Sequence, residues 1–253
     1  VLKNHMTHTI SPKLMNDCTI FTKPNAVLSS HAPIVGIDEV GRGALFGNMT
    51  VGAVILPNEL SGRFDEIDLT NTKISLLNDS KKLSEKRREQ LFDIITDLAL
   101  DYAIVDVPST IIDQINIYQA TMLGMKIAIE TIIIKNNLNE KNTTILIDGN
   151  QLPSMDGSLG EHFHQIYAMI KGDATHSSIA CASILAKVHR DRLMIQHAKS
   201  YPEYLLDKHK GYLTAKHKAA ILEYGILPEH RRSFSPIREL YNQGFINSNY
   251  WHS

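Results

Sequence analysis

Four acidic residues stand at positions where side chains commonly do chemistry in α/β proteins. Asp38 and Glu39 end one apolar run, Asp148 ends another, and Asp173 precedes a long segment with helical character. Taken singly, Asp148 before Gly149 is also typical of a turn, and Asp173 also favours the positive N-terminal end of a helix. The adjacent pair is harder to explain, because successive strand side chains point to opposite faces and one acid must face a covered side.

These acids predict a metal site if the strands that end in them are neighbours in one sheet, as open α/β folds usually arrange. Two unit charges 4 Å apart repel by about 4 kcal/mol at an effective dielectric constant of 20, so the cluster needs a cation or protons. Carboxylate oxygens favour Mg²⁺ or Mn²⁺ over Zn²⁺, since the sequence has no Cys pair or paired His at zinc spacing. A two-ion site with bound substrate hydrolyses phosphodiesters.

The elements around the acids alternate between strand and helix. Residues 34–39 and 50–57 predict two strands joined as a hairpin through a glycine-rich link. The continuous apolar run in 143–148 is typical of a central strand that is covered on both faces. Further strands are expected at 101–108 and 164–170, and helices at 84–100, 112–137, 174–199 and 214–224. This order predicts an α/β domain with a mixed sheet and a helical C-terminal part.

The charge distribution favours a polyanionic partner in one region. The 253 residues have a formal net charge of −1, but residues 171–232 hold eleven Lys and Arg against six Asp and Glu, a surplus of five. A basic segment of this kind is typical of a surface that contacts a phosphate backbone, and solvated helix faces carry similar surpluses. Cys18 and Cys181 are the two cysteines, too few for a disulfide framework or a thiolate metal site.

Residues 1–32 show no sustained periodicity, and we expect them to form a mobile extension. The opening residues lack the apolar core of a secretory signal, and no apolar run reaches the character of a membrane span, so a cytoplasmic protein is expected. Residues 33–240 hold the elements described above, and 241–253 are expected to form a tail. The chain is long enough for this middle part to bury the core of one main domain.

Seven successive segments resemble the motif blocks of bacterial ribonuclease HII, a type 2 RNase H, in the order found in that family. They are GIDEVGRG, DSKKLSEKRRE, NIYQATMLGM, LIDGN, KGDATHSSIACASILAKVHRDR, YPEYLLDKHKGYLTAKH and EYGILPEHRRSFSPI. The resemblance implies an RNase H-like fold, with a mixed sheet flanked by helices and a C-terminal helical extension. It makes residues 33–240 the catalytic domain.

The same resemblance implies a hydrolase, a metal-dependent endonuclease that uses Mg²⁺ or Mn²⁺. It would cut the RNA strand of RNA–DNA hybrids and nick duplex DNA on the 5′ side of an embedded ribonucleotide, leaving 3′-hydroxyl and 5′-phosphate ends. These activities serve ribonucleotide removal in DNA repair and RNA primer removal in DNA replication. The expected partners are these duplexes, and the expected oligomeric state is a monomer.

The chemistry of the family can be carried over residue by residue. Asp38, Glu39 and Asp148 match its metal-binding carboxylates, and Asp173 matches its fourth catalytic acid. Tyr212, in the segment HKGY, matches a tyrosine that packs against the sugar at the RNA-to-DNA junction. Without this context, Tyr212 would be interpreted as an ordinary half-buried tyrosine.

Two short blocks are implied to contact the substrate, namely Gly41, Arg42 and Gly43, and Ser80, Lys81 and Lys82. The first corresponds to the motif that recognises the ribose 2′-hydroxyl, largely through backbone groups that glycine lets approach closely. The second resembles a phosphate-contacting block, and alternatively it is the solvated start of the helix at residue 84. Lys187, Arg190 and Arg192 follow Asp173 on a helix, where phosphate contact and surface exposure are both open. His209, His217 and His230 show no pairing in the sequence, so core or surface roles are favoured.

Two departures from the family pattern leave alternatives open. Ala44 and Phe46 stand where Pro and Ala are expected after Gly-Arg-Gly, which would change the stiffness of the loop, and the segment 149–172 is longer than expected. Ribonuclease HIII shares the fold, but it typically has Gly-Lys-Gly and a large N-terminal substrate-binding domain, so Arg42 and the short leader count against it. A non-catalytic duplex-binding module is the second alternative, and the presence of all four acids disfavours it.

Overall fold

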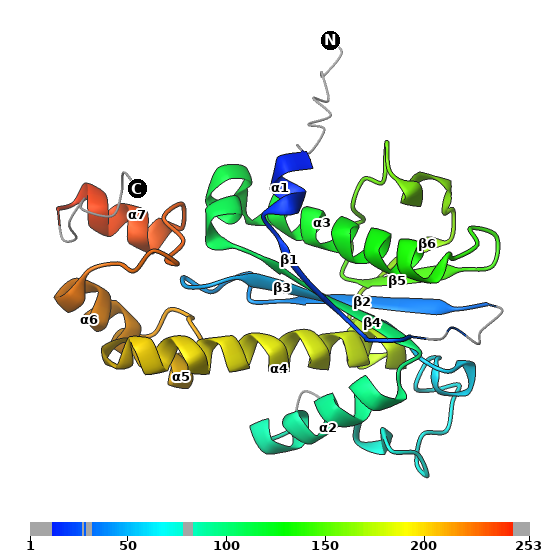
Figure 1. Ribbon diagram of the computed structural model, residues 1–253. Helices are drawn as coiled ribbons and strands as arrows, with labels where there is room; N and C mark the ends of the chain where they lie inside the picture. The colour runs from blue at the N-terminus through cyan, green and yellow to red at the C-terminus, as the bar shows by residue number, and fades with distance from the viewer. Residues whose placement is uncertain (1–11, 27, 29–31, 78–82, 245–253) are drawn as a thin grey trace.

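One six-stranded sheet organises residues 12–26, 28, 32–77 and 83–244, which the computed structural model describes (Figure 1). The strand order is β1-β4-β3-β2-β5-β6. Pairing is antiparallel from β1 through β4 and β3 to β2, whereas β5 is parallel to both β2 and β6, so the sheet is mixed as predicted. The strands are β1 Thr19–Thr22, β2 Ile34–Val40, β3 Met49–Ile55, β4 Asp101–Val107, β5 Thr144–Asp148 and β6 Ile166–Met169.

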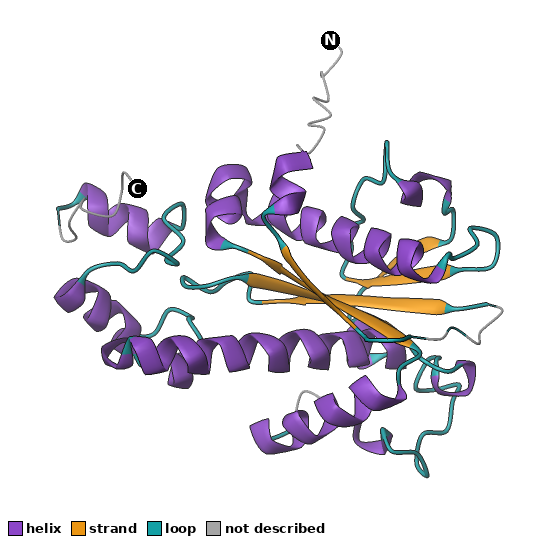
Figure 2. Ribbon diagram, viewed as in Figure 1, coloured by secondary structure: helices purple, strands orange, loops and turns teal. Residues whose placement is uncertain are grey.

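Helices cover both faces of this sheet (Figure 2). The helix α3, Ser109–Asn136, packs against β3 and β4 on one face, while α4, Ser177–Ser200, packs against β2 and β3 on the other, with α2, Glu85–Leu98, beside α4. The shorter elements are α1 Pro12–Asn16, η1 Asn58–Leu60, η3 Leu159–His162, η4 Gly172–Ala174, η5 Pro202–Tyr204, α5 Leu206–His209, α6 Ala215–Tyr224 and α7 Ser235–Asn242. From η5 to α7 the chain forms the C-terminal helical part, residues 201–244, beyond one end of the sheet (Figure 1).

Two glycines allow α4 to lie directly on the sheet. A Cβ atom at Gly36 would stand 2.2 Å from the backbone carbonyl carbon of Ser178, and one at Gly52 would stand 2.4 Å from the carbonyl oxygen of Ala182. Both distances are far below van der Waals contact, so only glycine fits at these positions of β2 and β3. The close approach fixes the first turns of α4 against the strand that ends in the adjacent acids.

The long helix α3 changes direction at Asn116, whose backbone has a positive φ of 67°. The side-chain Oδ1 of Asn116 accepts the backbone N–H of Gln119 at 3.1 Å, and so caps the second part of the helix. By length and composition alone α3 could cross a membrane, which the sequence-based expectation about apolar runs missed. More than half of its most apolar stretch is buried within this fold, because that stretch packs against the sheet.

The expectation of a mobile extension over residues 1–32 is wrong for part of that range. β1 pairs antiparallel with β4, from Thr19 opposite Asp106 to Thr22 opposite Ala103, and α1 contacts α3. The pairing satisfies the outer backbone groups of β4, which would otherwise form a sheet edge. A strand of four residues is too short to show periodicity, so the pattern gave no signal. Residues 1–11, 27 and 29–31 lie outside the described residues.

Other boundaries agree with the sequence or differ for local reasons. The β2–β3 hairpin is confirmed, and the hydroxyl of Ser84 caps α2 by accepting the N–H of Arg87 at 3.4 Å. α4 begins at Ser177 rather than at 174, because residues 172–174 form η4 and Nδ1 of His176 accepts the N–H of Ser178. The predicted tail from residue 241 begins within α7, and residues 245–253 lie outside the described part of the chain.

Candidate active site

The strands β2 and β5 bring two of the predicted acids side by side. They are parallel neighbours, with Ile37 opposite Ile147, and Asp38 and Asp148 are the next residues on each strand. The carboxyl ends of both strands therefore lie at the same edge of the sheet. The condition on which the predicted metal site depended is confirmed by this register.

The adjacent acids face different surroundings, as the alternation of strand side chains requires. Asp38 is 5% exposed, and it accepts a hydrogen bond from Ser183 on α4. Burial raises the pKa of Asp38 well above its ordinary value, and the nearby Glu39 and Asp148 raise it further. Burial also raises the pKa of Glu39, although Arg42, 3.3 Å away through Nη1 and Oε1, opposes that shift. Burial therefore makes both carboxyl groups harder to ionise than a solvated acid.

Asp173 lies beside Asp148, where the short turn η4 places it. Its backbone N–H donates to Oδ1 of Asp148 at 3.4 Å, and a Cβ atom on Gly172 would stand 3.3 Å from the same oxygen. The close backbone approach at Gly172 thus places the fourth acid next to the third. All four predicted acids are brought together, three from strand ends and one from the entry to α4.

The donor set of this cluster fits a hard divalent cation. Its members offer carboxylate oxygens, which Mg²⁺ and Mn²⁺ prefer, and a cation would offset the burial and the repulsion by Glu39 and Asp148 that raise the pKa of Asp38. Within the described ranges, no group of three Asp, Glu, His or Cys side chains already stands as a ready set of ligands.

An open cleft of about 420 Å³ is lined by two of these acids, Glu39 and Asp148. Glu39, Arg42 and Asp148 form one side, and α3 contributes the other. Sequence reasoning missed several of its lining residues, which are Tyr118, Thr121, Met122 and Met125 on α3 and Asn150 and Gln151 after β5. The long segment 149–172 thus begins as a wall of the cleft, and it continues through η3, which packs against α3. The motif LIDGN was the available signal for Asn150.

The Gly-Arg-Gly loop approaches other parts of the chain closely. Gly41 has a φ of +87°, and a Cβ atom there would stand 2.2 Å from Nε of Arg190, so glycine is required on both counts. Gly43 differs, since its nearest neighbour would be the ring of Tyr212 at 3.8 Å. Tyr212 is 37% exposed, and its ring centroid lies 5.7 Å from the guanidinium carbon of Arg190. The structure therefore brings together two of the predicted sugar-contacting positions.

Two fully buried arginines hold this loop in place. Arg190 donates hydrogen bonds to the carbonyl oxygens of Asn48, Lys210 and Phe46, at 2.8–3.0 Å. Both roles left open for Arg190 by the sequence, phosphate contact and surface exposure, are wrong, because burial and three carbonyl partners occupy its guanidinium.

Arg231, which sequence reasoning missed, donates to the carbonyl oxygens of Gly47 and Arg42. Burial and the nearby Arg190 lower the pKa of Arg231. Two charged groups are therefore held in the interior to fix the loop that carries Arg42.

The structure also locates most of the remaining residues that the sequence singled out. Lys187 pairs with Asp191 at 2.6 Å, and Arg192 stacks on Phe92 on the side of α2. Phe46 is fully buried, with its ring packed edge-on against the rings of His197 and His230, and Ala44 is also buried. Of these two departures from the family pattern, Phe46 thus belongs to a core between the loop and the C-terminal helical part. Ser80, Lys81 and Lys82 lie outside the described residues.

Comparisons with known proteins agree with this geometry. The sequence model of the Ribonuclease HII family matches residues 35–237. The ribonuclease HII of Psychrobacter arcticus is 45% identical over 220 residues, covering 81% of this chain and 77% of its own. The ribonuclease H2 structure from Pyrococcus horikoshii, at 23% identity, has the same fold with a TM-score of 0.65, covering 85% of this chain and all of that one.

A structure of Bst-RNase HIII in complex with Mn²⁺ also shares the fold, with a TM-score of 0.58 at 18% identity, covering 87% of this chain and 74% of that one. The family match and the identity to the Psychrobacter enzyme, rather than this fold likeness, decide between the alternatives. They exclude a merely binding module, since ribonuclease HII is an endonuclease that acts on RNA–DNA hybrids. The chain belongs to the ribonuclease HII family and is a ribonuclease H.

Proposed function

We propose that this ribonuclease H nicks duplex DNA on the 5′ side of an embedded ribonucleotide, in addition to cutting the RNA strand of hybrids, and leaves 3′-hydroxyl and 5′-phosphate ends. The observation that carries the proposal is the side-by-side position of Asp38 and Asp148 at one edge of the sheet, where Glu39 and Asp148 line an open cleft. A cluster of acids at a strand edge suits phosphodiester hydrolysis, because it holds cations where negative charge develops on the phosphate.

Asp38, Glu39 and Asp148 would hold the divalent ion or ions. A bound Mg²⁺ or Mn²⁺ supplies the acidified water and the charge stabilisation that phosphodiester hydrolysis needs. The presence of Mn²⁺ in the Bst-RNase HIII structure supports this choice of ion. Asp173, which follows Gly172 beside Asp148, is assigned the fourth catalytic role, to hold or move a proton near the phosphate that is cut.

Recognition of the ribonucleotide is assigned to the loop at Gly41 to Gly43 and to Tyr212. Gly43 lies beside the Tyr212 ring, which a Cβ atom at Gly43 would meet at 3.8 Å, so backbone groups of the loop stand next to the ring on which a sugar would rest. A ribose offers a 2′-hydroxyl to these groups, whereas a deoxyribose leaves them without a partner. Action as a monomer belongs to the same proposal, since one chain supplies the acids, the loop and the tyrosine.

A nicking assay tests the proposal. The substrate is a DNA duplex with one ribonucleotide, compared with a uniform RNA–DNA hybrid and with the same duplex made entirely of DNA. Each is tested with Mg²⁺, with Mn²⁺ and with EDTA. We expect one cut, 5′ to the ribonucleotide, that requires the metal and disappears in Asp148→Asn. Equal cutting of uniform hybrid and of the single-ribonucleotide duplex, unchanged in Tyr212→Ala, would contradict junction recognition. Binding without any cut in metal-replete protein would contradict the catalytic assignment.

A further inference from the structure

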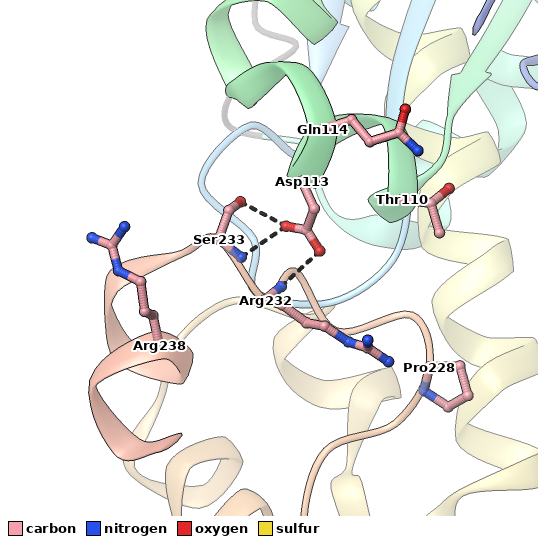
Figure 3. A pocket seen from close by; sticks show the side chains of 7 residues that line it. All are labelled: Thr110, Asp113, Gln114, Pro228, Arg232, Ser233 and Arg238. Carbon is pink, nitrogen blue, oxygen red and sulfur yellow. Dashed lines mark hydrogen bonds between the residues drawn. The ribbon is translucent and has the colours of Figure 1, made fainter. Parts of the chain in front are cut away.

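Asp113, on the first part of α3, fastens the C-terminal helical part to that helix (Figure 3). Its Oδ2 accepts the backbone N–H of Arg232 at 2.9 Å, and its Oδ1 accepts the backbone N–H and the hydroxyl of Ser233 at 2.8 and 2.6 Å. Hydrogen bonds to a charged group are stronger than those between neutral groups, so this carboxylate is a strong anchor. None of the roles proposed above uses this contact.

The part of α3 that carries Asp113 is a firm base for the contact. Ile111 and Ile112 precede it, and both are buried in the core between α3 and the sheet. The bend at Asn116 separates this first part of α3 from the second part, which lines the open cleft described above. Core packing against the sheet therefore sets the position of Asp113, and the contact holds the loop that leads into α7.

Residues 229–233, which we call the connector, join this anchor to the Gly-Arg-Gly loop. The backbone N–H of Arg231 donates to the carbonyl oxygen of Leu45 at 2.8 Å, and the N–H of Gly47 donates to the carbonyl oxygen of Glu229 at 3.0 Å. The side chain of Arg231 donates to two further carbonyl oxygens between β2 and β3. The connector thus contacts α3 through its last two residues and the link between β2 and β3 through its first three.

The charge of Asp113 supports the same connection. Burial and the nearby Arg190 lower the pKa of the fully buried Arg231 to about 9, while Tyr212 and Asp113 act in the opposite direction. A charged guanidinium makes stronger hydrogen bonds to carbonyl oxygens than a neutral donor does. Asp113 therefore favours the form of Arg231 that holds the loop.

We propose that Asp113 is a positioning residue for recognition of the ribonucleotide, and that it acts through the connector to fix the Gly-Arg-Gly loop relative to α3. This role rests on the proposed function, because the loop and Tyr212 are assigned there to the sugar. Asp38 and Asp148 stand on β2 and β5, which backbone pairing holds in the sheet. Loss of the anchor should therefore weaken substrate binding more than the chemical step.

Asp101 offers a matched control at the other end of α3. Its Oδ1 accepts hydrogen bonds from Nζ of Lys135 and from the backbone N–H of Tyr102, at 2.6 and 2.8 Å, and its Oδ2 accepts one from Nδ2 of Asn136 at 2.7 Å. Like Asp113, it has one oxygen with two donors and one oxygen with a single donor. Asparagine at either position replaces an accepting oxygen by a donor. Asp101→Asn should lose at least as much stability, because Asp101 is fully buried and also loses an ion pair.

The first test is hydrogen–deuterium exchange of the metal-free proteins, which reports local opening without substrate. In Asp113→Asn, peptides that cover residues 41–47 and 229–233 should exchange about tenfold faster than in the unmodified protein, because the connector has lost its anchor. In Asp101→Asn, faster exchange should appear at the C-terminal end of α3, with residues 41–47 unchanged. Unchanged exchange of residues 41–47 in Asp113→Asn, or equal acceleration there in both variants, would overturn the proposal.

The second test is steady-state nicking of the single-ribonucleotide duplex in Mn²⁺. We expect Asp113→Asn to raise KM about threefold to tenfold with kcat within about twofold, and Asp101→Asn to keep both within about twofold. Ser233→Ala removes one of the three bonds and keeps the carboxylate, so KM should rise by a smaller factor. A KM in Asp113→Asn equal to that in Asp101→Asn would count against the positioning role, and so would a fall in kcat as large as the rise in KM.

These measurements also separate the positioning role from the proposed function. If the unmodified protein nicks the duplex and Asp113→Asn behaves like Asp101→Asn, the positioning role fails and the proposed function stands. If the unmodified protein does not nick the duplex, the proposed function fails, and exchange of residues 41–47 still decides whether Asp113 fixes the loop.

Discussion

Nε2 of His217 lies 3.2 Å from Nε2 of His230 in the buried core of the C-terminal helical part. Nδ1 of His230 accepts the backbone N–H of Leu227, so its proton must be on Nε2, which donates to His217. The remaining proton of His217 is then on Nδ1, which donates to the carbonyl oxygen of Tyr212 at 3.0 Å. A hydrogen-bonded chain with one consistent set of tautomers thus runs from the loop at Leu227 to the tyrosine assigned to the sugar.

Substitution of His230 should lower both the stability of the fold and the recognition of the ribose sugar. In His230→Phe, the N–H of Leu227 and Nε2 of His217 lose their partners in the core, which should cost about 2 kcal/mol of unfolding free energy. Tyr212 also loses a support, so we expect a higher KM for the single-ribonucleotide duplex. Urea unfolding and steady-state nicking measure the two effects. His164→Phe, at an exposed position, is the control, and equal stability of the two variants would refute the structural role.

The same histidines predict that stability falls in acid. Burial lowers the pKa of His217 to about 4, and burial together with His217 lowers the pKa of His230 to about 3. Histidine in an unfolded chain has a pKa near 6.5. Below that pH the unfolded chain therefore binds protons that the two buried histidines of the folded chain do not bind. Stability is then lost progressively between about pH 6.5 and 3, by an amount on the order of 3 kcal/mol per histidine.

Denaturant unfolding at pH 7, 5.5 and 4.5 checks this dependence. The double variant His217→Phe/His230→Phe should be less stable at pH 7 but should show a shallower decline toward acid. A decline as steep as that of the unmodified protein would place the acid sensitivity elsewhere.

Asp38→Asn should separate activity from stability. The change removes a proposed metal ligand, so nicking should fall by at least about 100-fold, the scale on which loss of an essential catalytic group is felt. Burial and its acidic neighbours raise the pKa of Asp38, so removal of the charge should leave the metal-free protein as stable as before or more stable. Melting temperature in EDTA and nicking in Mn²⁺ report the two properties. Full activity in this variant would end the metal assignment, and Asp97→Asn on the exposed face of α2 is the control.

Two glycine substitutions should have opposite consequences. Gly36→Ala forces a Cβ atom into the backbone of α4, so it should destabilise the fold by about 1–3 kcal/mol or more. Gly43→Ala meets only the Tyr212 ring at 3.8 Å, so its unfolding free energy should stay within about 0.5 kcal/mol of the original. The added methyl group narrows the space between loop and tyrosine, and preference for a ribonucleotide over a deoxyribonucleotide should fall. A destabilised Gly43→Ala with unchanged preference would contradict the role of this loop.

Much of the fold follows from local pattern. The apolar runs at 34–39 and 143–148 predict strands because period and composition are properties of a few consecutive residues, and Ser84 predicts the start of α2 because capping is equally local. The short strand Thr19–Thr22 could not be predicted in this way, since backbone pairing with β4 holds it rather than its own sequence pattern. The motif blocks likewise predict the four acids and the family without any coordinates.

Tertiary structure decides what depends on residues that are distant in the chain. Asp38 and Asp148 become neighbours through the parallel pairing of β2 and β5, and the spacing of the two segments in the sequence does not specify that pairing. From the sequence alone, Arg190 looks like a surface residue on a basic helix. In the structure it is buried, because the fold brings the carbonyl oxygens that it binds together from two loops. The hydrogen-bonded chain through His217 and His230 arises in the same way. Hydrogen bonds and charges act over a few ångströms of space, and sequence spacing does not record which segments the fold brings within that reach.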